Sequence, residues 1–331
     1  MKPPLKVGAK TLSIGALTLD NPFILAPMAG ITDAPFRALC QHFGAGLTVS
    51  EMISANPDLS FDRKTRLRTL STGRSQIHAI QILGNDPAQM AEAAKRQADQ
   101  GAQLIDINMG CPAKKVCKKA AGSALMQDES LVGQILEHVS RAVEVPVTLK
   151  IRTGWNLENR NALRIGQIAE QSGIKALTIH GRSRACGFSG SAEYRTIQEV
   201  KQALGIPVIA NGDITTPEKA LEVLQSTGAD AVMIGRGALG APWLFSALNH
   251  ALNSRPPPEP PKGPALLELM RHHLEALYHH YGWSQGLRVA RKHIGWYLDR
   301  QSVNPEVVRR FHQQTSTEGQ WSVLCEELES E

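Results

Sequence analysis

Eight short apolar runs recur along the chain with helix-like segments between them, and this alternation limits the fold more than any other feature. Most of the runs are apolar through their middles, as in parallel strands that are covered on both faces. The distance from one run to the next is about the length of a strand, a helix and two loops. The runs are residues 23–27, 47–52, 78–84, 104–110, 145–152, 175–182, 206–213 and 230–237.

Helix-start signals between the runs support this assignment. Asp86-Pro87-Ala88-Gln89 offers an N-cap, a proline at the first helical position and a glutamine at the third. Thr216-Pro217-Glu218 repeats the opening. Eight βα units predict an α/β fold of the TIM (β/α)8 barrel type. A doubly wound sheet is the less favoured alternative, because open sheets usually have fewer strands.

The amino-acid composition changes after Asn253. Residues 254–264 contain six prolines, which predict an extended, semi-rigid linker. Residues 265–331 show helical periodicity without strand-like runs, so we expect a C-terminal all-α helical-bundle domain after a barrel of residues 1–253. Residues 286–310 carry six Lys/Arg against two Asp/Glu. This basic helix fits a nucleic-acid contact and a solvated charged face equally well.

Composition restricts the class of protein. With 42% hydrophobic and 20% charged residues, the chain is typical of globular proteins, and its net charge of +5 permits a polyanionic partner without establishing one. No apolar run is long enough for a membrane span or a signal peptide, so we expect a cytoplasmic protein. The five cysteines form no CxxC motif or Cys/His cluster, so neither a metal site nor a disulfide is expected. Cys111 is then either a packing residue or a chemical group.

Polar residues follow many of the runs, and in a barrel these strand ends converge on one rim. Any one of them could be structural, but six strands contribute together, which predicts a site. The turns Asn211-Gly212-Asp213 and Gly235-Arg236-Gly237 can face an anion with backbone N–H groups, where barrels commonly hold a phosphate. Residues 235–240 also match GxGxxG, but they follow the last strand and lead into the proline-rich segment, unlike a dinucleotide fold.

Four strand-end residues have the chemistry that a flavin ring requires. Gln81 and Asn108 supply amide donors and acceptors, and Lys150 and His180 supply cations or further donors near the ring. From the residues alone, the prediction is a phosphorylated cofactor in the mouth of a barrel.

Several long motifs, in this order, resemble those of the tRNA-dihydrouridine synthases, and most closely the bacterial B type. The resemblance covers the barrel and continues into the helical tail. The motifs are APMAGITDAPFR (26–37), VSEM (49–52), QILGNDP (81–87), DINMGCPAKKV (106–116), LKIRTGW (149–155), IHGRSRA (179–185), IANGDI (209–214), MIGRGALGAPW (233–243) and RVARKHIGWYL (288–298).

The resemblance implies FMN as cofactor, NADPH or NADH as reductant and tRNA as partner. We also expect a monomer that binds neither metal nor membrane. Cys111 would be the general acid, while Asn108 and Arg182 would face the target uracil. The helical domain would bind tRNA. The residues implied at FMN are Pro27, Met28, Ala29, Gln81, Lys150, His180, Asn211, Gly212, Asp213, Gly235 and Arg236, and those implied at tRNA are Lys114, Lys115, Arg288, Arg291 and Lys292.

The chemistry agrees with these implied roles. Reduction of the C5=C6 bond of uridine needs a hydride at C6, which reduced FMN would supply, and a proton at C5, which Cys111 would supply. A thiol is mostly protonated at neutral pH, although nearby lysines such as Lys114 and Lys115 favour the thiolate. A uridine inside folded tRNA would have to be turned out into the pocket.

Two other functions fit parts of the sequence. An FMN barrel that reduces a free small molecule, of the dihydroorotate or enoate type, would not need the basic helical tail. An RNA-binding protein without catalysis would not need Cys111, Lys150 and Gln81 together. The sequence does not determine the modified uridine or the set of tRNAs, and the B-type resemblance favours a uridine of the D-loop.

Overall fold

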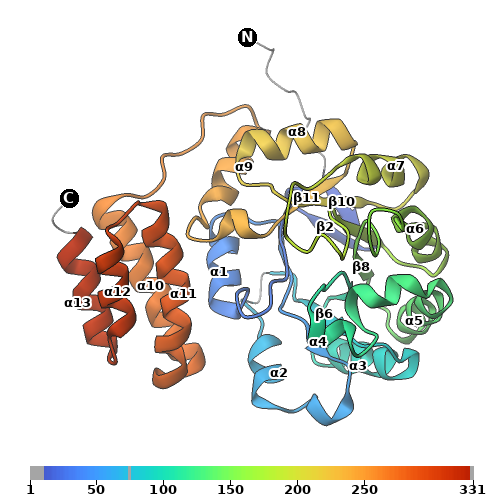
Figure 1. Ribbon diagram of the computed structural model, residues 1–331, viewed down its shortest axis with the longest axis horizontal. Coiled ribbons are helices and arrows are strands. Elements are labelled where there is room, and N and C mark those ends of the chain that lie inside the picture. The colour runs from blue at the N-terminus through green and yellow to red at the C-terminus, as the bar shows by residue number, and fades with distance from the viewer. Residues whose placement is uncertain (1–10, 74–75, 329–331) are drawn as a thin grey trace.

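A computed structural model describes residues 11–73 and 76–328, and a parallel sheet forms its centre (Figure 1). The strands of this sheet are β3 (Phe23–Leu25), β4 (Leu47–Thr48), β5 (Ile53–Ser54), β6 (Ala79–Leu83), β7 (Leu104–Met109), β8 (Val147–Arg152), β9 (Ala176–His180), β10 (Val208–Asn211) and β11 (Ala231–Ile234). Their order is β4-β3-β11-β10-β9-β8-β7-β6-β5.

The sheet closes on itself through its two end strands. β4 and β5 lie at opposite ends of the order, yet only residues 49–52 separate them in the chain. Between them, Val49 forms a parallel bridge with Ala79, and the N–H of Ser50 donates to the carbonyl of Ala79. β4 and β5 are therefore two parts of one interrupted strand. The eight-stranded barrel prediction is confirmed, whereas the second strand, expected to be continuous over 47–52, is broken.

Helices cover the outside of the barrel, as Figure 1 shows for α5 to α8. The expected caps are present, since the Asp86 side chain accepts from the N–H of Gln89 and the Thr216 side chain accepts from the N–H of Lys219. The helices of this part are α1 (Ala34–His42), α2 (Arg63–Arg68), α3 (Pro87–Asp99), α4 (Lys114–Cys117), α5 (Glu129–Ala142), α6 (Ala162–Gln171), α7 (Arg195–Ala203), α8 (Pro217–Thr227) and α9 (Leu244–Leu252), with 3-10 turns at Pro57–Leu59, Gly122–Gln127 and Arg236–Ala238.

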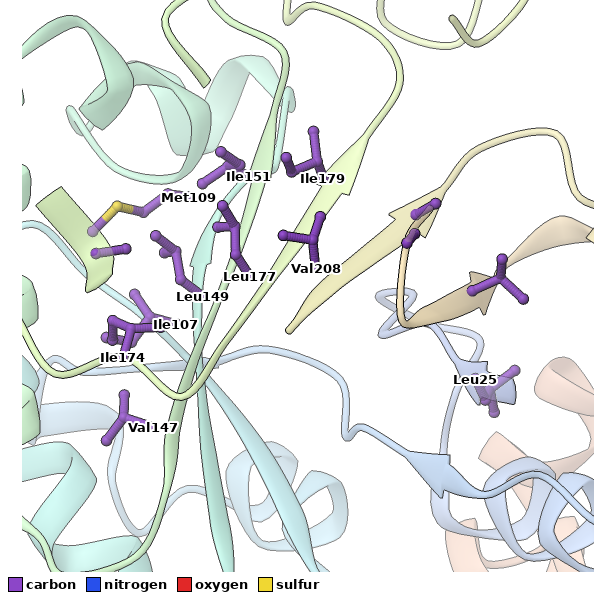
Figure 2. Packing of buried hydrophobic residues seen from close by; sticks show 14 of the residues in the cluster. Leu25, Ile107, Met109, Val147, Leu149, Ile151, Ile174, Leu177, Ile179 and Val208 are labelled. Carbon is purple, nitrogen blue, oxygen red and sulfur yellow. The ribbon is translucent and has the colours of Figure 1, made fainter. Parts of the chain in front are cut away.

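The main core lies between the strands and these helices. Ile107, Leu149 and Leu177 stand in register across β7, β8 and β9 and are fully buried. Figure 2 shows these side chains close together. Because helices cover this face and side chains fill the barrel interior, the strands need apolar residues on both faces, which explains the continuous apolar runs.

A short antiparallel hairpin precedes the barrel and was not predicted from the sequence. It consists of β1 (Leu12–Ile14) and β2 (Leu17–Leu19). Leu12, Ile14 and Leu19 are buried in a cluster with residues at the beginnings of the strands, among them Ile24 and Leu104. The hairpin therefore closes the end of the barrel opposite the strand carboxyl ends.

The last four helices lie at one side of the barrel, next to α1 (Figure 1). They are α10 (Gly263–Tyr281), α11 (Trp283–Arg300), α12 (Pro305–Gln313) and α13 (Thr317–Leu328). They share a hydrophobic cluster that includes Met270, Ile294 and Phe311. Within the described ranges, no helix is long and apolar enough to cross a membrane.

Polar contacts join these helices to the barrel. The Arg300 guanidinium donates to the carbonyls of Leu239 and Gly237, at 2.7 Å each. Gly240, with φ +62°, approaches α11 so closely that a Cβ there would lie 2.1 Å from the carbonyl oxygen of Trp296. This junction therefore requires glycine at position 240.

Candidate active site

A cavity of about 1050 Å³ opens at the carboxyl ends of the strands. Its size is in the range of cofactor sites in proteins. Five of the residues expected at the site do not line it: Lys115, Arg182, Arg288, Arg291 and Lys292. The expected residues that do line it are Pro27, Met28, Ala29, Gln81, Asn108, Cys111, Lys114, Lys150, His180, Asn211, Gly212, Asp213, Gly235 and Arg236.

A chain of hydrogen bonds runs from a buried carboxylate to the loop of Cys111. Asp106 accepts from the Thr148 hydroxyl at 2.6 Å and from Nε2 of Gln81 at 2.7 Å. Gln81 Oε1 accepts from Nδ2 of Asn108 at 2.8 Å, and Asn108 Oδ1 accepts from the N–H of Cys111 at 2.9 Å. Asp106 and Thr148 were absent from the sequence prediction. Asp106 faces the barrel interior in the middle of β7. A charged residue is unusual there, and this feature of the sequence could have identified Asp106 as a functional residue.

The Cys111 thiol lies in an environment that keeps it protonated. Burial raises the pKa of this thiol, and the backbone N–H of Ala113, followed by the Arg152 and Lys150 cations, opposes the shift only in part. The loop is anchored at the Cys111 carbonyl, which accepts from the hydroxyl of Ser123 at 2.9 Å. Protonation of the thiol near neutral pH is therefore compatible with the basic residues around it.

Lys150 and Asn211 hold one wall of the cavity. The Lys150 ammonium donates to Asn211 Oδ1 at 3.1 Å, while Nδ2 of Asn211 donates to the carbonyl of Met233 at 2.7 Å. Burial, and secondly the Arg152 cation, lower the pKa of Lys150 to about 8. Lys150 is thus still largely a cation at neutral pH, but it can lose its proton at a modest cost.

His180 is a neutral imidazole. Burial, followed by repulsion from Lys150 and other cations, lowers its pKa to about 2. Its Nε2 lies 3.3 Å from a guanidinium nitrogen of Arg182, which can only donate, so Nε2 accepts and the ring proton is on Nδ1. His180 therefore offers no positive charge to a cofactor, in contrast with the cationic option that the sequence left open.

Arg182 has a different environment from the one expected. Its side chain is 3% exposed and pairs with the carboxylate of Asp213 through bonds of 2.9 and 2.7 Å. Its remaining donors reach the carbonyls of Ser189 and Gly190 and the His180 ring. All five N–H groups are thus used within the protein, so in this structure Arg182 has no free donor for a uracil, contrary to the role that the resemblance implies. The sequence could not predict this pairing because the partner, Asp213, lies in the turn after the next strand, β10.

The carboxylate of Asp213 is also engaged by Arg236, at 3.2 Å. Hydrogen bonds from Arg182 and the Ala192 N–H lower the pKa of Asp213 against the effect of burial, so it is an anion. A phosphate beside it would be repelled by that side chain, which leaves backbone N–H groups and Arg236 as the groups that can bind a phosphate here. The Arg236 side chain is 55% exposed.

Phe188 lies at the edge of the cavity. Its ring centroid is 5.4 Å from the guanidinium carbons of both Arg152 and Arg236, and the side chain is 59% exposed. An exposed aromatic ring between two cations can stack on a planar ligand group. Phe188 was not among the expected residues.

The basic residues expected at tRNA form two groups, those at the rim or on an exposed face and those that bond backbone carbonyls of the protein. Lys114 and Lys115 begin α4 at the rim, and Arg288 is exposed on α11. Arg291 instead donates to the carbonyl of Gln314 at 3.2 Å, and Lys292 donates to the carbonyl of Gly30 at 2.6 Å. Lys292 therefore contacts the loop after the first barrel strand.

The lining residues fit a phosphorylated ring cofactor such as FMN. Amide groups and the Lys150 cation lie on β6, β7 and β8, where they can bond the edge of a ring. Gly212, Gly235 and Arg236 follow β10 and β11, where a phosphate can be bound. The donors thus suit the two ends of one elongated, anionic molecule.

Solved structures with the same fold have little sequence identity to this chain. A histamine dehydrogenase from Rhizobium sp. 4-9 aligns with a TM-score of 0.58 at 13% identity, over 74% of this chain and 48% of that one. A 2-naphthoyl-CoA reductase aligns with a TM-score of 0.58 at 12% identity, over 75% of this chain and 52% of that one. This chain spans about half the length of each, and the likeness shows the barrel fold.

Closer relatives match over almost their whole length. The chain is 52% identical to tRNA-dihydrouridine synthase B of Pseudomonas aeruginosa over 307 residues, which cover 93% of this chain and 92% of that one. It is 54% identical to the protein of the same name from Pectobacterium carotovorum, over 91% of this chain and 94% of that one. The family model described as dihydrouridine synthase (Dus) matches residues 24–330. The chain therefore belongs to the dihydrouridine synthase family.

Proposed function

We propose that the protein reduces the C5=C6 bond of a uridine in tRNA to 5,6-dihydrouridine, with FMN as cofactor and NADPH or NADH as reductant. The observation that carries the proposal is the position of Cys111 beside Asn108 and Lys150 in one cavity at the strand ends. The named relatives support tRNA as the substrate. We expect a monomer in the cytoplasm and a uridine of the D-loop as the target.

FMN bound in this cavity supplies the hydride that C6 of the uracil receives. Gln81 and Lys150 bond the edge of its ring, and Lys150 places a cation where negative charge gathers on reduction. Pro27, Met28 and Ala29 line its face. Gly212, Gly235 and Arg236 bind the phosphate through backbone N–H groups and one guanidinium.

Cys111 donates the second hydrogen, as a proton, to C5 of the uracil. Its burial favours the thiol over the thiolate, so the proton is available before the base arrives. After transfer, the thiolate lies near Lys150 and Arg152, the cations that lower the thiol pKa. These charges stabilise the thiolate only when it forms, which is the condition for lowering the barrier.

Asn108 recognises the uracil through its side-chain amide. Its oxygen is occupied by the N–H groups of Cys111 and Gly110, while one N–H is used by Gln81. The other N–H faces the sulfur of Met52 at 3.7 Å, which is a weak acceptor, so this hydrogen is available to a uracil carbonyl.

The uridine has to leave the folded RNA to reach this cavity. In this proposal, Lys114 and Lys115 at the rim and Arg288 on α11 contact RNA phosphates. These contacts supply affinity that depends on salt, whereas Asn108 supplies the recognition of the base.

The test uses purified protein, NADPH and unmodified tRNA, with mass spectrometry of the digested RNA. We expect a mass gain of two hydrogens at one mapped uridine. No gain with any tRNA, together with turnover of orotate or a small enone, would show instead an FMN barrel for free small molecules. Binding of tRNA without flavin or turnover would favour a non-catalytic RNA-binding protein.

A further inference from the structure

The loop after β3 lines the cavity with Met28, Ala29 and Ile31. It is a tight turn, because the N–H groups of Ile31 and Thr32 both donate to the Met28 carbonyl at 3.0 Å. Gly30 lies inside the turn with φ +75°, a conformation that suits glycine. The orientation of the Gly30 peptides therefore sets where Met28 and Ala29 lie along the cavity.

Both backbone polar groups of Gly30, its N–H and its carbonyl, form hydrogen bonds with side chains. Its N–H donates to Oε1 of Glu51 at 2.5 Å, and Glu51 is buried and paired with Arg68 at 3.1 Å. Its carbonyl accepts from the ammonium of Lys292 at 2.6 Å. The first contact comes from the interrupted second strand, whereas the second comes from α11, across 262 residues of sequence.

The far end of the same turn is held by the same helical region. The Tyr281 hydroxyl donates to Oδ2 of Asp33 at 3.0 Å, and Nε2 of His293 lies 3.6 Å from that oxygen. Asp33 is 1% exposed and caps α1 through the N–H of Phe36. Consecutive residues of α11, Lys292 and His293, thus approach the two ends of the turn.

We propose that α11 is a positioning element of the flavin site, in which Lys292 holds the Gly30 carbonyl and thereby sets the position of Met28 and Ala29 against the flavin. This inference rests on the proposed function, because it takes FMN as the occupant of the cavity. Lys292 is then a positioning residue that acts through Gly30. The helical region contributes to the cofactor site in addition to any contact with RNA.

The competing role for Lys292 is the phosphate contact implied by the family resemblance. The two roles predict that different ligand affinities depend on the Lys292 side chain. A phosphate contact affects tRNA affinity and its salt dependence, and leaves the flavin alone. A positioning contact affects FMN affinity and the flavin spectrum in the absence of RNA.

The test compares Lys292→Met with Arg288→Met, a variant one turn earlier at an exposed position of the same helix. Apoprotein of each is titrated with FMN, and tRNA affinity is then measured on FMN-saturated protein at two salt concentrations. For Lys292→Met we expect an FMN dissociation constant roughly three to ten times that of the wild type, as for loss of one hydrogen bond to a charged group at an accessible site. We expect its tRNA affinity to stay unchanged. Arg288→Met should give the opposite pattern.

Tyr281→Phe provides a second variant that keeps the ring and removes the hydroxyl bond to Asp33. It should also raise the FMN dissociation constant, with an altered visible circular dichroism of the bound flavin. An FMN dissociation constant within twofold of wild type for both Lys292→Met and Tyr281→Phe would overturn the inference, whatever the effect on tRNA. In that case, wild-type protein that binds FMN and forms dihydrouridine would leave the proposed function standing. Wild-type protein that binds no FMN would refute both.

Discussion

The backbone N–H of Cys111 donates to the side-chain oxygen of Asn108 at 2.9 Å. One contact thus connects the proposed proton donor to the residue proposed to recognise the uracil. Because Asn108 donates to Gln81 and Gln81 donates to Asp106, the orientation of both amides depends on a carboxylate inside the barrel. The site can therefore be perturbed from a residue that does not line the cavity.

Asp106→Asn should weaken FMN binding and destabilise the fold. Asp106 accepts from both Gln81 and Thr148, whereas the new amide has only one oxygen to accept with. Its NH2 group would face either the Gln81 NH2, which can only donate, or the Thr148 hydroxyl, which would have to become an acceptor. An unsatisfied buried polar group costs about 1–3 kcal/mol of unfolding free energy. Urea denaturation and FMN titration measure the two effects. Thr148→Val, which removes one bond and adds no donor, is the matched control and should cost less; equal effects would argue against the orientation of Gln81 as the cause.

Cys111→Ala should slow tRNA reduction severely while FMN binding and NADPH oxidation persist. Loss of a general acid lowers the rate roughly a hundred- to ten-thousand-fold. Single-turnover reduction of tRNA by prereduced enzyme isolates this step. Full activity in this variant would remove Cys111 from the reaction.

The pH dependence of the same step gives a separate test of Cys111. Burial raises the pKa of its thiol above the usual 9.0, so the donor form persists at neutral pH and is lost only as the pH rises through that raised value. The single-turnover rate should therefore fall on the alkaline side. Cys111→Ser retains a hydroxyl that does not titrate there, so its lower rate should lack this limb, and an identical limb would assign the titration to another group.

The barrel could be predicted from the sequence because most of its strands have a recognisable local pattern of residues. A run such as residues 23–27 is apolar, short and followed by a turn, and this pattern is visible without knowledge of the strand's partners. The hairpin Leu12–Leu19 alternates buried and exposed residues, but its strands of three residues are too short for that pattern to stand out. The break in the second strand could not be predicted, since it depends on Val49 bridging to Ala79 as the barrel closes.

The cavity-lining residues were predictable for a related reason. Residues such as Gln81 and Lys150 line the cavity because they lie in the last residues of parallel strands whose carboxyl ends converge on it. What the sequence could not supply is which side chains neutralise one another. Arg182 and Lys292 are basic residues in suitable motifs, yet one pairs with Asp213 and the other bonds Gly30. Such pairings depend on side-chain geometry across strands and between distant helices.

Lys150→Met should weaken FMN binding and change its pH dependence. With its pKa lowered to about 8, Lys150 in the apoprotein loses its proton as the pH rises through that value. Wild-type affinity for FMN should therefore fall between neutral and mildly alkaline pH, because the Lys150 ammonium that donates to the edge of the ring in the proposed complex is lost. The variant should bind weakly and with little pH dependence over the same range. A variant whose affinity falls in parallel with the wild type would assign the effect to a different group.

Asp213→Asn should reduce the free energy of unfolding by about 2–4 kcal/mol, because it leaves the buried Arg182 guanidinium without its counter-charge. Urea denaturation near neutral pH measures this loss. Glu137→Gln, which removes an exposed pair with Arg141, should change stability by less than about 1 kcal/mol.

The difference in unfolding free energy between wild type and Asp213→Asn should decrease at acid pH. The folded pKa of Asp213 lies below its usual 3.8, so the stabilisation from the carboxylate is present above that value and is lost as the pH falls through the folded pKa. Wild type and Asp213→Asn should therefore converge at low pH. A constant difference down to low pH would show that the charge of Asp213 is not its source.

The hairpin of β1 and β2 has a consequence for the order of events in turnover. It covers the far end of a barrel whose interior side chains fill, so in the proposed reaction the nicotinamide and the uridine enter by the opening at the strand carboxyl ends and occupy the cavity in turn. The oxidised nicotinamide then has to depart before the RNA base can enter. Such alternation gives double-displacement kinetics, in which reciprocal plots at several tRNA concentrations are parallel lines and each substrate in excess slows the half-reaction of the other.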